Sequence, residues 1–194
     1  MRKVGESDDA VSPIIGVTLM VGLTVIMSSV VAVSVFTFTL PESAPQAKIV
    51  VVEAKGGMHP SVTLNNNAIV LRHKGGDELS ENNSKIIIKG RGYAYTGSYT
   101  GGANPPVQEI TVVYSNLKGS HYDDNDPNTQ EDIVIGGTWS AGEIATLRGR
   151  DGQDPSNSCE QKYWLETGST VSVTIIDTNT NEVIAVSHAT VKDA

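Results

Sequence analysis

The stretch that decides the fold runs from Val11 to Leu40, VSPIIGVTLMVGLTVIMSSVVAVSVFTFTL. These 30 residues contain no acidic, basic or histidine side chain. A helix of this length would extend about 45 Å, whereas about 20 apolar residues are enough to cross a bilayer core. Small and hydroxyl residues interrupt the run without forming a polar face, so apolar material must surround the helix on all sides. We therefore predict a membrane-spanning helix over residues 11–40.

The two ends of this helix are marked in the sequence. Ser12 is a suitable N-cap, and Pro13 would occupy the first helical position, where its missing N–H costs nothing. Pro41 disfavours helical geometry in the residue before it. A cleavable secretory signal is the competing interpretation, but its apolar core spans only about 7–15 residues and ends at a small-residue site. A membrane anchor fits the length better.

Charge is distributed unevenly around the apolar run. The 194-residue chain has a net charge of −8, with 14 Lys and Arg against 22 Asp and Glu. Residues 1–10 carry −1 and residues 41–194 carry −7. Arg2 and Lys3 precede the helix, so the positive-inside bias predicts a cytoplasmic N-terminus and an external C-terminal part. The acidic exterior makes nucleic acid an unlikely partner, and it favours a halophilic source.

A β-rich domain is expected after a short linker at residues 41–47. From residue 48 to 194 the apolar runs become short and β-branched, and Gly-Gly pairs with Asn and Asp clusters separate them. Residues 177–181 are expected to form a hairpin loop. The predicted fold class is α+β, a long N-terminal hydrophobic helix followed by an antiparallel, immunoglobulin-like β-sandwich. The expected strands are residues 48–53, 68–71, 85–89, 109–114, 133–135, 144–147, 170–176 and 183–186.

No pattern in the sequence indicates catalysis. The four histidines, His59, His73, His121 and His188, lack the paired spacing of a zinc site. Cys159 is the single cysteine, so no intrachain disulfide forms, and we expect a partly buried, inert thiol. Motifs of nucleophilic, zinc-hydrolytic or phosphate-binding sites do not occur in the sequence. We expect neither enzymatic activity nor a cofactor.

Three features of the domain suggest binding or modification. The acidic run 123–132 offers Asp124, Asp126 and Asn128 as a weak Ca²⁺ candidate, but it departs from the EF-hand pattern and a solvated loop is the preferred interpretation. Asn82 begins an N-x-S acceptor triplet, which an exported domain would expose to glycosylation. Tyr93, Tyr95 and Tyr99 would serve either as adhesive loop residues or as an aromatic face of the sheet.

Ala10 to Met20, AVSPIIGVTLM, resembles the amino-terminal signature of archaeal type IV pilins, particularly the haloarchaeal ones. The resemblance covers roughly residues 10–35 and implies a prepilin with a class III signal peptide as leader at residues 1–10. It also implies cleavage by a prepilin peptidase between Ala10 and Val11, with Gly5–Glu6 as the alternative bond. Asp8 and Asp9 stand where many such leaders carry a basic residue. The element 73–79, HKGGDEL, also looks like a recurring part of haloarchaeal pilin heads.

Taken together, these features predict the structural subunit of an archaeal type IV adhesion pilus. The helices would form the filament core, in which small residues permit close approach, namely Gly16, Gly22, Ser28 and Ala32. The partners expected are further copies of the chain, the membrane before assembly, the prepilin peptidase and the pilus assembly machinery. The alternatives are a membrane-anchored extracellular binding module or a minor pilin.

Overall fold

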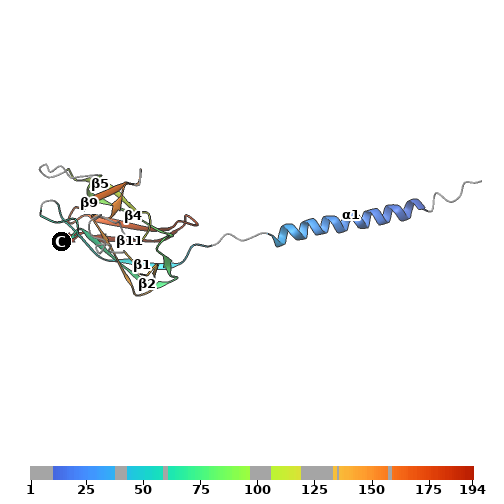
Figure 1. Ribbon diagram of the computed structural model, residues 1–194, viewed down its shortest axis with the longest axis horizontal. Helices are drawn as coiled ribbons and strands as arrows, with labels where there is room; N and C mark the ends of the chain where they lie inside the picture. The colour runs from blue at the N-terminus through green and yellow to red at the C-terminus, as the bar shows by residue number, and fades with distance from the viewer. Residues whose placement is uncertain are drawn as a thin grey trace, which may run out of the picture. The chain divides into compact units, whose positions relative to one another are not determined.

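The computed structural model describes residues 11–37, 43–58, 61–96, 106–118, 133–134, 136–156 and 159–194. The chain divides into two compact units, residues 1–42 and residues 43–194. Figure 1 shows the first as a single helix and the second as a compact stack of strands, and each is described here by itself. The predicted helix followed by a β-sandwich head is therefore confirmed.

Helix α1 comprises Val11–Phe36, 26 residues. It starts earlier than predicted: the expected N-cap Ser12 is its second residue and Pro13 its third, two positions later than the first helical place predicted for it. The end also differs from the prediction of residue 40, because Thr37 already lies in a turn and residues 38–42 fall outside the described ranges. Thr37 closes the last turn by donating both its backbone N–H and its hydroxyl to the carbonyl of Val33.

Two sheets form the head. The four-stranded sheet has the order β12-β1-β2-β7, and the six-stranded sheet has the order β11-β10-β4-β5-β8-β9, in which β4 also pairs with β9. A short ladder joins β3 to β6. The bounds are β1 Ala47–Gly56, β2 Ala68–Gly76, β3 Leu79–Ser80, β4 Ser84–Thr96, β5 Gln108–Tyr114, β6 Thr138–Trp139, β7 Ile144–Arg148, β8 Gly152–Gln153, β9 Glu160–Leu165, β10 Thr170–Asp177, β11 Val183–Thr190 and β12 Lys192–Asp193.

Seven of the eight predicted strands lie within observed strands, and the exceptions have local causes. Ile133 and Val134 form a buried bend instead of a strand, and residue 135 is not described. Strand β9 was not predicted, because the polar residues Gln161 and Lys162 interrupt the apolar pattern of its sequence. Its β-forming side chains are Tyr163 and Trp164. The sandwich is also not wholly antiparallel, since β12 pairs parallel with β1. The predicted hairpin between β10 and β11 is confirmed, with Asn181 at a φ of 58°.

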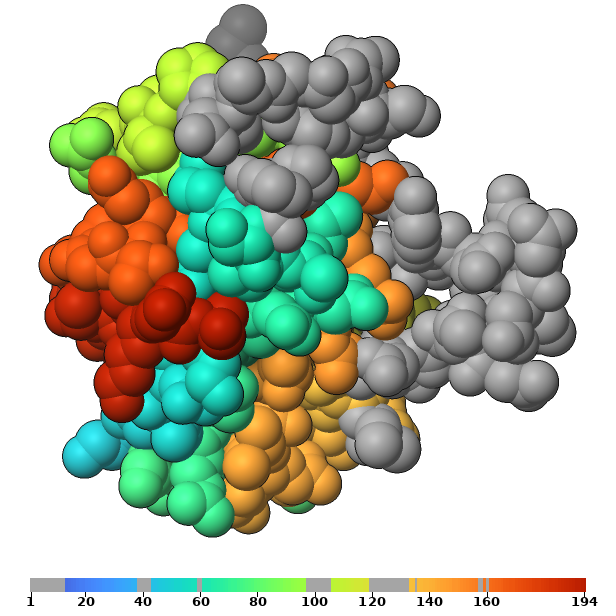
Figure 2. All heavy atoms as spheres, turned by 90° about the vertical axis from the view of Figure 1, so that its left-hand side faces the viewer, coloured from blue at the N-terminus to red at the C-terminus, as the bar shows by residue number. Residues whose placement is uncertain are grey.

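Alternating side chains of the long strands build one hydrophobic core between the two sheets. Strand β10 is an example of this alternation: Val171, Val173 and Ile175 are buried, while the residues between them are half-buried. The C-terminus completes the core, since Val191 is buried and its side chain occupies the space that a Cβ at Gly56 would need. Figure 2 shows these C-terminal residues, in dark red, beside the cyan and teal segment that includes β1.

A buried amide links three parts of the head. Asn67 is fully buried; its Nδ2 donates to the carbonyl of Gly57 at 3.2 Å, and its Oδ1 accepts from the backbone N–H of Leu165 at 2.8 Å. Its backbone carbonyl accepts from Gly149 at 2.7 Å. Asn67 therefore connects the end of β1, the turn after β7 and the end of β9.

Two tyrosine hydroxyls meet inside the head. The oxygens of Tyr114 and Tyr163 lie 3.0 Å apart, and the Tyr114 hydroxyl donates to the carbonyl of Arg148 at 2.7 Å. Burial away from water disfavours the phenolate and raises the pKa of both tyrosines. The pair is therefore a neutral hydrogen-bonded unit of the core.

Replacement of Asn67 by Ala should lower the free energy of unfolding by about 2–3 kcal/mol, because it leaves a buried N–H and a buried carbonyl unsatisfied. Asn66→Ala is the matched control, since the Asn66 side chain is exposed. That control should cost at most about 0.5 kcal/mol. Urea denaturation of the full-length chain in detergent measures both; equal losses would contradict the role of the Asn67 amide.

The tyrosine pair predicts an alkaline limit to stability. Below pH of about 10 both states hold the protons, and above it the unfolded chain releases protons that the folded head keeps. Each buried tyrosine should then remove about 1.4 kcal/mol of unfolding free energy per pH unit. Tyr163→Phe should roughly halve the decline between pH 10 and 11. The measurement is urea denaturation at pH 8, 10 and 11, and an unchanged slope in the variant would refute the assignment.

Candidate functional site

Helix α1 has no outward-facing polar group along its described length. The stretch Pro13–Phe36, 24 residues with a mean hydropathy of 2.3, is long and apolar enough to cross a membrane. Its hydroxyl groups bond back to carbonyls of their own helix at 2.7–2.9 Å: Thr18 to Ile14, Thr24 to Val21, Ser28 to Thr24, Ser29 to Val25, Ser34 to Val30 and Thr37 to Val33. Polar atoms are thus satisfied internally, and the surface offered to surroundings is hydrocarbon.

The small residues predicted to permit helix packing lie on several sides of α1. Gly16 and Gly22 are six positions apart, and Ser28 follows after six more, so each is turned about 120° from the one before. A Cβ added at either glycine would meet nothing within 4 Å in the single chain. Any close approach at these positions must therefore come from other molecules, arriving from more than one direction. The role of Gly16, Gly22, Ser28 and Ala32 stays a prediction.

The predicted leader and cleavage bond fall at the boundary of the described residues. Ala10 lies outside them, while Val11 is the first residue of α1. A cut between the two would leave a chain that begins with the helix itself.

The start of the head is held by the element at residues 73–79. The backbone N–H of Gln46 donates to Oδ2 of Asp77, and the N–H of Asp77 donates to the carbonyl of Gln46, both at 2.8 Å. His73 is fully buried against Trp139, and its Nε2 lies 2.9 Å from the Asp77 carbonyl. This clamp fixes the residues that follow the helix unit. Residues 73–79 were recognised as a motif in the sequence, but their role in holding the start of the head was not predicted. The signal that could have indicated it is Gly-Gly before Asp, which is typical of a constrained turn.

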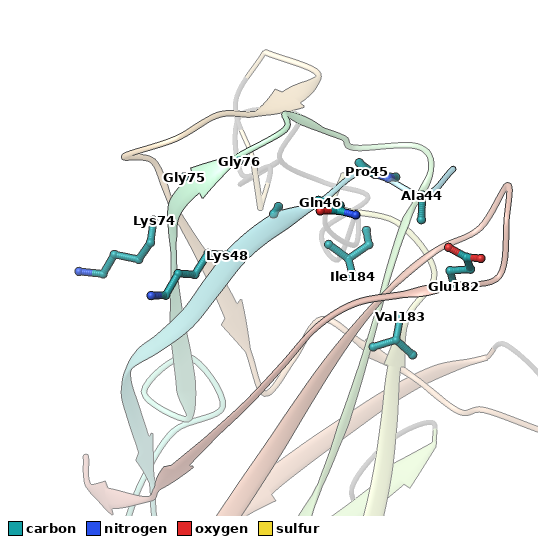
Figure 3. Close-up of a pocket in the computed structure, with 11 residues that line it drawn as sticks. Ala44, Pro45, Gln46, Lys48, Lys74, Gly75, Gly76, Glu182, Val183 and Ile184 are labelled. Carbon is teal, nitrogen blue, oxygen red and sulfur yellow. The ribbon is translucent and has the colours of Figure 1, made fainter. Parts of the chain in front are cut away.

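An open pocket of about 610 Å³ adjoins the clamp. It is lined by the entry residues 44–47, Lys48, the end of β2 and the start of β11. In Figure 3 Lys48 and Lys74 extend toward one side of the opening, while Glu182 lies on the opposite side. Val183 and Ile184 contribute its apolar surface. Its other lining residues are Ala44, Pro45, Gln46, Ala47, Gly75 and Gly76.

The remaining predicted site residues are dispersed. Asn82 is exposed in the turn before β4, where a glycan would find room. Cys159 is exposed, which corrects the expected partial burial; it precedes β9 at the head surface. His188 is exposed and far in sequence from the buried His73, and the described residues contain no group of three or more metal ligands. His59, His121, Tyr99 and the Ca²⁺ candidates Asp124, Asp126 and Asn128 lie outside the described ranges.

An aromatic cluster links β4 with β9. Tyr93 and Tyr95 stack at 5.9 Å between ring centroids, and Tyr95 stacks on Trp164 at 5.6 Å. Trp164 is buried and donates its indole N–H to the carbonyl of Val62 at 3.1 Å. The two tyrosines therefore form an aromatic face of the sheet rather than loop residues. Trp164 was missed because its strand was not predicted.

The described chain therefore combines one helix that is long and apolar enough to cross a membrane with a β-sandwich head. Residues 9–49 match the family described as archaeal type IV pilin, N-terminal. The chain thus carries the N-terminal domain of archaeal type IV pilins, which confirms the resemblance seen in the sequence. It is also similar to an uncharacterized protein of Archaeoglobus fulgidus, at 27% identity over an alignment of 149 residues that covers 70% of this chain and 98% of that protein.

Gly76→Ala should loosen the clamp. Gly76 has a φ of 100°, and a Cβ there would overlap the carbonyl oxygen of Gln46. We expect a loss of about 2–4 kcal/mol in unfolding free energy from strain and steric overlap together. Gly142→Ala is the matched control, because its φ is 98° with open space around it. It should cost about 1 kcal/mol.

Urea denaturation of the full-length variants measures this difference. Limited proteolysis between the helix and β1 gives a second readout, because only Gly76→Ala should expose the entry segment. Equal destabilisation by both variants would show that backbone strain alone, and not contact with Gln46, determines the effect.

Proposed function

We propose that this chain is a structural subunit of an archaeal type IV adhesion pilus. The observation that carries the proposal is the surface of α1, whose described side chains from residue 13 to 37 are all exposed and uncharged in the single chain. Such a surface requires lipid or other apolar helices on every side. The match of residues 9–49 to the pilin N-terminal domain supports sister helices as the final surroundings.

The precursor would be held in the membrane by α1 with its N-terminus in the cytoplasm. Arg2 and Lys3 before the helix support this orientation. A prepilin peptidase would cut between Ala10 and Val11, and the assembly machinery would then move the helix from lipid into the filament. The β head would remain outside the membrane throughout, on the cell surface and then on the filament.

Assembly would repeat one heterologous contact between copies. Two different patches of the chain meet along the filament, so the arrangement stays open instead of closing into a ring. The heads would cover the outside and supply the adhesive surface. The exposed Asn82 is compatible with a glycan there.

Filaments sheared from producing cells should contain this chain with Val11 as the first residue. Electron microscopy and N-terminal sequencing of the sheared fraction provide the measurement. Recovery solely from membranes, with Met1 or Arg2 still attached, would instead identify a permanently anchored binding module. A chain present at only a few copies per filament would identify a minor pilin.

Gly16→Leu and Gly22→Leu should each reduce filament yield by about tenfold while leaving membrane insertion unchanged. In the single chain nothing lies within 4 Å of a Cβ at either position, and Leu is a better helix former than Gly. Any loss must then come from contacts with other helices, where small residues permit close approach.

Val17→Leu is the control, because it adds one methylene group at an exposed position beside Gly16. It should assemble normally. Immunoblots of sheared and membrane fractions compare the three variants, and normal yield from both glycine variants would show that these positions are not close contacts.

A further inference from the structure

The outer face of the four-stranded sheet is basic, although the protein as a whole is acidic. Lys48 and Lys55 on β1, Arg72 and Lys74 on β2, Arg148 on β7 and Lys192 on β12 all alternate with buried residues and so lie on this face. We call these six residues the basic face. One carboxylate accompanies them, Glu53, whose Oε2 lies 3.4 Å from Nζ of Lys55.

Strand register places these cations in two groups on the same face. Lys55 pairs with Lys192 on one side and with Ala68 on the other, and Ala68 pairs with Arg148. Arg72 lies two rows further along the face, between Val50 and Ile144, and the row between holds Glu53, Val70 and Thr146. Because same-face rows are about 7 Å apart along a strand, the basic face has a cationic group toward each end and a mostly apolar row between them.

A count of the charged residues shows how unevenly charge is distributed between the basic face and the rest of residues 41–194. Residues 41–194 hold 12 Lys and Arg and 19 Asp and Glu. The basic face takes six of the cations and Glu53, a net of +5, which leaves −12 on the rest of this part of the chain. The rest of this part of the chain is therefore acidic by composition, in contrast to the basic face.

Apolar side chains accompany the basic face. Among the described head residues, four large hydrophobic side chains are more than half exposed, and two of them belong to the four-stranded sheet: Val52 in the bulge of β1, 54% exposed, and Ile144, 53% exposed. Val50 and Val70 are half-buried beside them. An apolar patch edged by charge is the composition of a protein-binding surface.

We propose that the basic face binds the acidic surface of a second copy of this chain. This inference rests on the proposed function, because it supplies the contact between heads in the filament. Two identical basic faces would repel each other, so the patch disfavours a closed two-fold dimer. Contact with the acidic remainder of the next copy is attractive and joins two different patches, which is the arrangement that extends without closing.

Arg72→Glu with Lys74→Glu tests the proposal, because both side chains are exposed and the change reverses the sign of the group at one end of the basic face. Lys85→Glu with Lys89→Glu is the matched control. It makes the same change in net charge on the outer face of the six-stranded sheet, where these residues flank the buried Ile86 and Ile88. Lys48→Glu with Lys192→Glu is a second variant of the basic face, on different strands.

Each full-length variant replaces the native chain in filament-producing cells, and immunoblots compare sheared filaments with total protein. Both basic-face variants should yield about tenfold fewer filaments, and the control should stay within about twofold of the unsubstituted chain. Thermal denaturation in detergent checks that the heads fold equally well. Purified filaments of the unsubstituted chain should also dissociate at lower shear when salt is raised, because salt screens the contact.

Equal losses in all variants would show that net charge alone matters, and normal yields in all would show that the face does not join heads; either result overturns the proposal. Normal filaments from Arg72→Glu/Lys74→Glu that no longer bind phosphatidylglycerol vesicles would assign the face to a lipid surface instead. Absence of filaments from the unsubstituted chain would overturn the proposed function itself, which separates that failure from the failure of the face.

Discussion

The constraint on which the rest of the structure depends is the absence of a polar face on α1. A helix with apolar side chains all round has no side that is suited to water, so each of its sides needs apolar surroundings. The chain divides into two units, and the hydrophobic core of the head is made of head residues. Every described side chain of α1 from residue 13 onward is left for other molecules to cover.

The first described residues of the head are held against the end of β2. The clamp formed by Gln46, Asp77 and Gly76 gives them a defined path, using one backbone–backbone hydrogen bond, one bond from a backbone N–H to the Asp77 carboxylate, and one position where only glycine fits. The buried His73 supports the clamp from inside the sandwich. Tension on the residues before Gln46 would therefore act directly on the hydrogen bonds between Gln46 and Asp77.

The sequence predicted those features that depend on composition and period. The charge-free run defined the helix, and β-branched runs located the long strands β1, β2, β4, β5, β7, β10 and β11, because each has a buried face that the alternation reveals. Strand β9 was not predicted from the sequence, because it is supported by contacts with residues distant in the chain. These are the hydrogen bond from the Leu165 N–H to Asn67 and the stacking of Trp164 on Tyr95. The parallel strand β12 and the basic face were also not predicted, because both depend on the register between strands that are distant in the chain. The immunoglobulin-like topology stays a prediction.

The hydroxyl groups that bond within α1 have a consequence for reversibility. Moving this helix between lipid and a bundle of its own kind breaks no hydrogen bond, because each of the six hydroxyls keeps its partner on the same helix. The two environments then differ mainly in van der Waals packing, which changes by small increments along the helix. In the proposed filament, transfer of the helix in either direction would therefore require no change in its covalent or hydrogen-bonded structure.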